Sequence, residues 1–275
     1  MSFTTADVVK LRKSTGAGMM DCKNALTESD GDFERAIEII RERGKLVASK
    51  RADREATEGA VLAKVTDDKK FGAIVVLNCE TDFVARNEKF IAFTTQILDA
   101  ALNFQPESLE ELKDIVLDGR TIGAQITEQI GIIGEKLDLS FYGKVNAETV
   151  VPYVHPGNKL ATIVGFNKEG IENQLGKDVA MQVAAMNPVA VNRESVPQQV
   201  IDKELEIARE KYRLEGKPEK MLDKIAQGAL QSWFKESTLL EQTFIKDAKI
   251  SVKQYIAQAD KLLAVTKFER YALEA

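Results

Sequence analysis

The sequence NCETDFVARNE occupies Asn78–Glu88 and lies between two segments whose hydrophobic patterns differ. Before it, Phe71–Leu77 is a continuous apolar run with the length and composition of a buried strand. After it, Phe90, Phe93 and Ile97 recur at helical spacing. The segment is therefore a strand-to-helix turn, and it predicts a chain in which strands and helices are interleaved.

The turn itself combines capping residues with apolar ones. Thr81 or Asp82 is suited to cap the following helix. Phe83 and Val84 stand at the corner, where side chains tend to point outward. Because phenylalanine is most often buried, two interpretations of Phe83 stay open: a plug in the core, or an apolar side chain offered to a partner.

A second motif, TGAGMMDCKNAL, occupies Thr15–Leu26. Together with Asn78–Glu88 it closely resembles elongation factor Ts, the guanine-nucleotide exchange factor of the translational GTPase elongation factor Tu. Both motifs match the family nearly residue for residue, in the family's order and spacing. The resemblance runs through almost the whole chain and weakens after about Asn187. It implies the function, whereas the architecture follows from the residues themselves.

The composition of the 275 residues favours a protein that binds other proteins and is not an enzyme. The two cysteines, Cys22 and Cys79, form no CxxC motif, and His155 is the only histidine, so we expect neither a metal site nor a disulfide framework. Nucleotide-binding glycine motifs are missing, and no cofactor is expected. A net charge of -5 argues against direct nucleic-acid binding. The chain has no apolar run of membrane-spanning length and no signal peptide, so we expect a cytoplasmic protein without a membrane partner.

Residues 1–43 are predicted to form three short helices. Thr4 is suited to cap the first, Gly16-Ala17-Gly18 breaks it, and Ser29–Asp32 separates the second helix from the third. This module resembles the ubiquitin-associated (UBA-like) three-helix fold. Residues 44–59 are polar and rich in Lys, Arg and Ala, a composition typical of a solvated helix or linker, and we assign them as a polar linker.

The middle of the chain predicts a duplicated α+β core of two subdomains, at 60–138 and at 139–187 with 235–275. Each begins with a strand hairpin and continues into a helix. The expected strands are Val61–Val65, Phe71–Asn78, Leu139–Val145, Val150–Val154, Leu160–Phe166 and Ala264–Leu273. The expected helices include Leu109–Leu117, Ile122–Ile133, Leu175–Met186 and Ser251–Leu263.

Residues 188–234 are predicted to be an inserted antiparallel helical hairpin. Its first helix has a coiled-coil spacing, and Gly216-Lys217-Pro218 ends that helix. Its second helix is expected to present Leu222, Ile225, Ala229 and Trp233 on one face. A hairpin of this size is marginal alone, so a contact in a dimer and a simple protrusion both stay open.

The resemblance also implies a mechanism and a set of site residues. In the family, the Thr-Asp-Phe-Val turn docks between helices of the GTPase, its aromatic side chain separates them, and the magnesium ion is lost. Carried over to this chain, the turn is Thr81, Asp82, Phe83 and Val84, with Phe83 as the wedge.

Two further sets of partner contacts are expected. In the N-terminal module they are Val8, Leu11, Met19 and Met20, since adjacent methionines do not both face one helical core. In the second subdomain they are Met181, Gln182 and Val183, where Gln182 replaces the His that many members carry.

We thus expect an α+β exchange factor for elongation factor Tu. Whether it forms a homodimer or a two-to-two complex with the GTPase stays open. The alternative is a UBA-type protein-binding adaptor without exchange activity. An enzyme that uses Asp82 or Glu80 as a general base is disfavoured.

Overall fold

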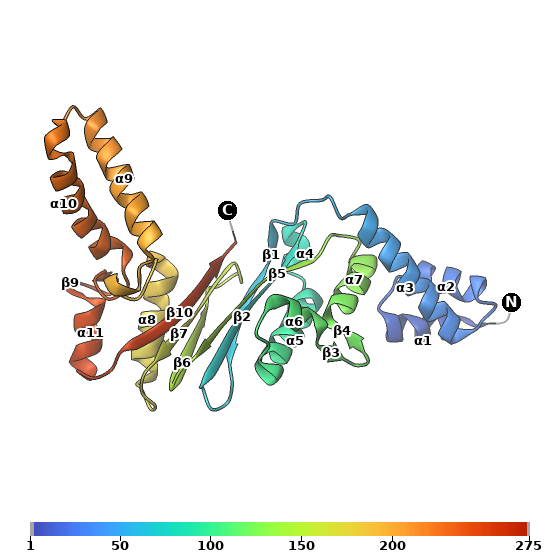
Figure 1. Cartoon of the computed structure of the whole chain (residues 1–275). Helices are drawn as coiled ribbons and strands as arrows, with labels where there is room; N and C mark the ends of the chain where they lie inside the picture. Colours follow the sequence, from blue (N-terminus) through green and yellow to red (C-terminus); the bar gives the residue numbers. More distant parts are fainter. Residues whose placement is uncertain (1–2, 274–275) are drawn as a thin grey trace.

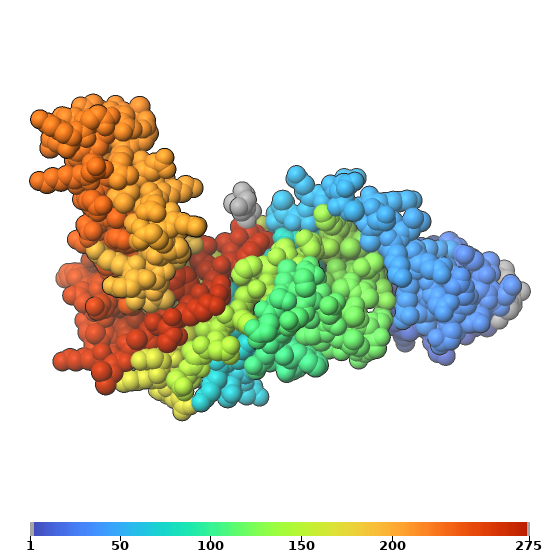
Figure 2. All heavy atoms as spheres, viewed as in Figure 1, coloured from blue at the N-terminus to red at the C-terminus, as the bar shows by residue number. Residues whose placement is uncertain are grey.

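The computed structural model describes residues 3–273 and is elongated (Figure 1). Three helices lie at one end, two sheets with their covering helices form the middle, and a helical hairpin projects at the other end (Figure 1). In the space-filling view the hairpin, coloured orange, stands out from the rest of the molecule (Figure 2). No helix among residues 3–273 is both long and apolar enough to cross a membrane.

The N-terminal helices are α1 (Thr5–Thr15), α2 (Met19–Glu28) and α3 (Phe33–Lys50). The predicted cap is confirmed, because Thr4 and Asp7 form a reciprocal capping box. Gly16, at φ 74°, ends α1 in the left-handed conformation that glycine adopts without strain. Their shared core consists of Val8, Leu11, Ala17, Cys22, Ala25, Leu26, Ala36 and Ile39.

The third helix is longer than predicted. α3 continues through Gly44 to Lys50, so the expected linker of residues 44–59 is helical over its first seven residues. Lys, Arg and Ala are good helix formers, and Val47 and Ala48 gain packing against the core of the first sheet. A polar composition alone does not show this packing.

The first sheet contains β1 (Glu58–Val65), β2 (Phe71–Cys79) and β5 (Asp138–Asn146) in the antiparallel order β1-β2-β5. All nine residues of β2 are buried, as the apolar run predicts. The assignment of Leu139–Val145 to the second subdomain is wrong, because this strand pairs with β2. A central strand needs a neighbour on each edge, and the hydrophobic pattern of a strand does not identify which sheet it joins.

One face of this sheet is covered by the segment between β2 and β5. It contains α4 (Asp82–Ala85), α5 (Glu88–Phe104), α6 (Leu109–Asp114), β3 (Val116–Leu117), β4 (Arg120–Thr121) and α7 (Ile122–Ile133). The predicted helix 109–117 therefore ends early, whereas α7 has its predicted bounds.

The second sheet contains β6 (Thr149–Val154), β7 (Leu160–Phe166) and β10 (Val265–Ala272) in the order β10-β7-β6. It is covered by α8 (Asn173–Met186) and α11 (Val252–Ala259), and β8 (Thr243–Phe244) pairs with β9 (Asp247–Ser251). Apart from the additional short helices α4 and α6 in the first half and an inserted helical hairpin in the second, the two halves of the core share one order of elements: a strand hairpin, a long helix, a short hairpin, another helix and a last strand. In each half this last strand pairs with the second strand of the first hairpin. The two sheets share a buried cluster made of Val61, Ala63, Ile74, Val76, Val145, Val150, Ala161 and Ile163.

The projecting hairpin consists of α9 (Gln198–Leu214) and α10 (Glu219–Ser237), after a 3-10 turn at Arg193–Ser195. The two helices lie side by side (Figure 1). The buried face of α10 is Leu222, Ala226, Leu230 and Phe234. Except for Leu222, the expected face is therefore wrong by one position, and Ile225, Ala229 and Trp233 lie half-buried at its border.

Candidate functional site

The turn after β2 forms a short helix of its own. Thr81 is the N-cap of α4, and its hydroxyl accepts a hydrogen bond from the Val84 N–H at 3.4 Å. Asn87 then caps α5 separately, by accepting from the Lys89 N–H at 2.9 Å. The predicted capping role of Thr81 is confirmed for α4, while α5 begins at a second cap.

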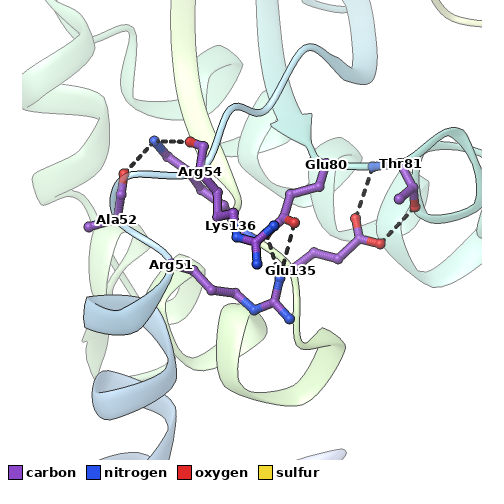
Figure 3. Close-up of polar contacts among 7 residues, drawn as sticks. All are labelled: Arg51, Ala52, Arg54, Glu80, Thr81, Glu135 and Lys136. Carbon is purple, nitrogen blue, oxygen red and sulfur yellow. Dashed lines mark hydrogen bonds and ion pairs between the residues drawn. The ribbon is translucent and has the colours of Figure 1, made fainter.

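A carboxylate distant in sequence holds this turn. Glu135, which follows the end of α7, accepts hydrogen bonds from the Thr81 backbone N–H at 3.1 Å and from the Thr81 hydroxyl at 2.7 Å (Figure 3). Both oxygens of Glu135 are thus committed to one residue. A carboxylate that accepts two hydrogen bonds in this way fixes orientation as well as position.

Glu80 connects the same turn to two other segments (Figure 3). Its carboxylate accepts from the Arg51 guanidinium at 2.8 and 3.0 Å and from the Lys136 backbone N–H at 2.6 Å. The Lys136 ammonium donates to the carbonyls of Ala52 and Arg54. The Lys136 N–H, and then Arg51, lower the pKa of Glu80. Glu80 is therefore a structural anion and is unsuited to act as a general base.

On this base Phe83 points away from the protein. Phe83 is 85% exposed, while the neighbouring Val84 is half-buried and Ala85 is buried against the first core. The interpretation of Phe83 as a core plug is wrong. Asp82 pairs with Arg86 at 3.1 Å across one turn and is partly exposed. The turn therefore presents one large apolar side chain, and hydrogen bonds of Thr81 and Glu80 hold the backbone beneath it.

Behind the turn lies a buried thiol. The Cys79 thiol donates to the Thr81 carbonyl at 3.2 Å, and burial raises its pKa to about 12. A thiol in this state is a poor nucleophile. Residues 3–273 contain no group of three or more His, Cys, Asp or Glu side chains arranged to hold a metal ion.

The N-terminal candidates separate into two pairs. Met19 is 37% exposed and Met20 64% exposed, so both side chains are accessible at the surface. Val8 and Leu11 instead lie in the core of the three-helix module, which leaves their side chains no surface for a contact. The capped α1 turns these two residues inward.

The candidates on α8 lie beneath the surface. Met181 is half-buried, and Gln182 and Val183 are buried. The Gln182 side chain donates to Gln242 and to the Thr243 carbonyl, each at 3.1 Å, and accepts from the Ile245 N–H at 2.9 Å. Gln182 therefore supports the β8–β9 turn from within.

Sequence reasoning missed Arg51, Glu135 and Lys136. All three act through contacts between residues distant in sequence, and no local pattern indicates them. The one usable signal is Gly134, which ends α7 in the left-handed conformation and directs the chain toward the turn.

The chain is similar to several named proteins. A family model described as Elongation factor TS matches residues 80–275. The chain is 55% identical to Elongation factor Ts of Porphyromonas gingivalis over 100% of both chains. It is 51% identical to Elongation factor Ts of Christiangramia forsetii over 98% of both, and 49% identical to that of Azobacteroides pseudotrichonymphae over 99% of both.

Proposed function

Because this chain belongs to the elongation factor Ts family, the exchange factors of elongation factor Tu, we propose that it releases GDP from that GTPase by inserting the Thr81–Val84 turn. The 85% exposure of Phe83 is the observation that carries this proposal. No covalent bond is formed or broken in the process.

Acceleration of release requires a difference in affinity. An exchange factor must bind the nucleotide-free GTPase more tightly than the GDP-bound form. In our proposal Phe83 inserts between helices of the GTPase and favours a state whose magnesium and phosphate site is disturbed. The apolar surface of Phe83 is buried in that state, so its burial supplies the differential free energy.

The hydrogen bonds that hold the turn beneath Phe83 support this mechanism. Glu135 holds Thr81 by two hydrogen bonds, and Glu80 ties the turn to Arg51 and Lys136. A preorganised side chain loses less conformational entropy on binding than a mobile one. We propose that Asp82, which is partly exposed, meets polar groups of the GTPase and that Val84 supports the ring from below.

A second contact is proposed at Met19 and Met20. Methionine adapts to irregular apolar surfaces, and both side chains are exposed at the start of α2. We propose that these two methionines dock on the nucleotide domain of the same GTPase.

A third contact is proposed at the end of α8. Met181, Gln182 and Val183 form its supporting layer, and the exposed Met186 and Ile245 supply the apolar surface above it. The role of Gln182 is then to position the Ile245 turn.

We further propose that the N-terminal helices form a UBA-like module, that α9 and α10 pack as a coiled coil, and that the protein acts in the cytoplasm without a nucleic-acid or membrane partner. Light scattering of the complex distinguishes a one-to-one from a two-to-two assembly.

The test uses elongation factor Tu loaded with a fluorescent GDP. Substoichiometric amounts of this chain should accelerate release with turnover. Binding without acceleration would support the UBA-type adaptor and refute the exchange function.

A further inference from the structure

Helices α3 and α7 cross at two glycines. A β-carbon added to Gly131 would lie 2.4 Å from the Cα atom and 3.3 Å from the backbone nitrogen of Gly44. Nonbonded carbon atoms are optimally about 3.5–4.0 Å apart, and the obstacle here is backbone, which has no rotamer to move aside. The separation of packed helices depends on the side chains at their contact, so these helices approach as closely as they do because Gly131 has no side chain.

The helix α3 belongs to two cores. Ala36 and Ile39 are buried among the N-terminal helices, whereas Val47 and Ala48 pack against the core of the first sheet. The point where α3 meets α7 therefore sets the tilt of the whole N-terminal module relative to the core.

Ion pairs lie one helical turn from the glycine contact. Arg41 pairs with Glu128 at 3.3 Å, and Arg120 pairs with the same carboxylate. Arg41 precedes Gly44 by three residues, and Glu128 precedes Gly131 by three. Since these side chains are partly exposed, the ion pairs are weak in energy, but they oppose rotation of α3 about the crossing.

The turn that leads to Met19 and Met20 also lies close to α7. A β-carbon at Gly16 would lie 3.5 Å from the Cδ1 atom of Ile132, the residue after Gly131. A crevice of about 640 Å³, bordered by Gly18, Ile40 and Gly131, lies between the module and the core. Because this space is open, the module has room to tilt if the helices are forced apart.

We propose that the contact of Gly44 with Gly131 is a positioning element that holds Met19 and Met20 at a fixed separation from Phe83. This inference rests on the proposed function, in which both contacts engage one GTPase molecule. Two linked contacts strengthen each other only when their spacing matches the partner. Loss of the close crossing would misplace the methionines and leave the Phe83 turn intact.

The test compares Gly131→Ala with Gly44→Ala. Both variants replace a helical glycine with alanine and gain the same helix propensity. Only the first clashes, because a β-carbon at Gly44 meets its nearest atoms at an ordinary 3.7 Å. Gly131→Ala should raise the half-saturating concentration in GDP release about tenfold, the loss of one good interface contact, with an unchanged maximal rate.

Gly44→Ala should match the wild type. Equal behaviour of the two variants, or a lower maximal rate at an unchanged half-saturating concentration, would refute the positioning role. Glu128→Gln weakens both ion pairs without adding bulk, and it should shift the half-saturating concentration in the same direction by less. This variant keeps the proposal testable if Gly131→Ala does not fold.

A distance measurement separates this inference from the proposed function. Spin labels on cysteines placed at the exposed Asn24 and Asn103 report the module-to-core distance in the free protein, since Cys22 and Cys79 are buried. Gly131→Ala should shift the distance distribution and Gly44→Ala should not. An unshifted distribution would refute the claim that the Gly44–Gly131 contact sets the position of the module relative to the core. This result would hold even if the protein did not accelerate GDP release. A shift with unchanged affinity refutes its role in binding.

Discussion

Replacing Phe83 with alanine tests whether this side chain serves binding or folding. Because Phe83 is 85% exposed, it contributes little buried area to the folded protein. Truncation at such a surface position changes the free energy of unfolding by about 0.5 kcal/mol or less. Truncation of a buried phenylalanine costs about 3–5 kcal/mol. The structure thus predicts an almost unchanged melting temperature.

The effect on exchange should be large. An aromatic side chain at the centre of an interface typically costs about 2 kcal/mol or more when truncated, which corresponds to about 30-fold. We expect the efficiency of GDP release from elongation factor Tu to fall by about this factor, because in the proposed mechanism Phe83 supplies the apolar surface that is buried only in the disturbed state.

Two other phenylalanines provide matched controls. Phe104, 60% exposed, ends α5, about 25 Å along the helix from its start. Phe104→Ala should leave both stability and exchange unchanged. Phe90 is 2% exposed, and Phe90→Ala should lower stability strongly. Release is followed by stopped-flow fluorescence and stability by urea unfolding. If Phe83→Ala destabilised the protein as much as Phe90→Ala, or exchanged GDP at the wild-type rate, the reasoning would be wrong.

Three further predictions concern the polar contacts of the turn and the mutual effect of GDP and this protein on each other's binding to elongation factor Tu. Glu135→Gln should slow release by less than Phe83→Ala and add nothing to it in the double variant, since both act on one turn; additive losses in release assays would contradict this. The folded-state pKa of Glu80 is lowered, so its contribution to stability is present above the unfolded value near 4.5 and is lost as pH falls through the folded value. Urea unfolding from pH 6 to 3 should show a loss of stability that is smaller in Glu80→Gln, and identical profiles would exclude this role. Finally, GDP and this protein should lower each other's affinity for elongation factor Tu by the same factor, and removal of magnesium should make that factor smaller. Titrations of both ligands, each with and without the other, measure the factor in the presence and absence of magnesium. A factor independent of magnesium would place the action on the base or sugar side of GDP.

Local patterns predicted the elements that depend on local chemistry. The apolar run of β2, the helical period of α7 and the capping box at Thr4 each appear in the structure where the sequence indicates them. The strand β5 has an equally clear pattern, but its partner depends on which edge of β2 is free, and that is a property of the assembled sheet.

The site could be predicted only in part for the same reason. The identity of the turn residues was clear, but a single aromatic at a corner is compatible with burial and with exposure. The turn that carries Phe83 is held by the contact of Thr81 with Glu135, across 54 residues of sequence. The buried state of Gln182 likewise depends on Gln242 and Ile245, which lie about 60 residues further on. Such polar contacts between distant segments leave no periodic trace.

The base of the α9–α10 hairpin has a consequence for how this chain could change in length. The Val189 N–H donates to the Ser237 carbonyl at 2.8 Å, and the Leu239 N–H donates to the Ala190 carbonyl at 2.9 Å. The chain therefore leaves the core and returns to it at adjacent points. A shortened, lengthened or foreign insertion at this position would alter neither the register of a sheet nor the order of the surrounding elements, and the entropic cost of closing a different loop grows only slowly with its length. The hairpin is therefore a position at which another binding segment could replace α9 and α10, while the core that carries the Thr81–Val84 turn stayed unchanged.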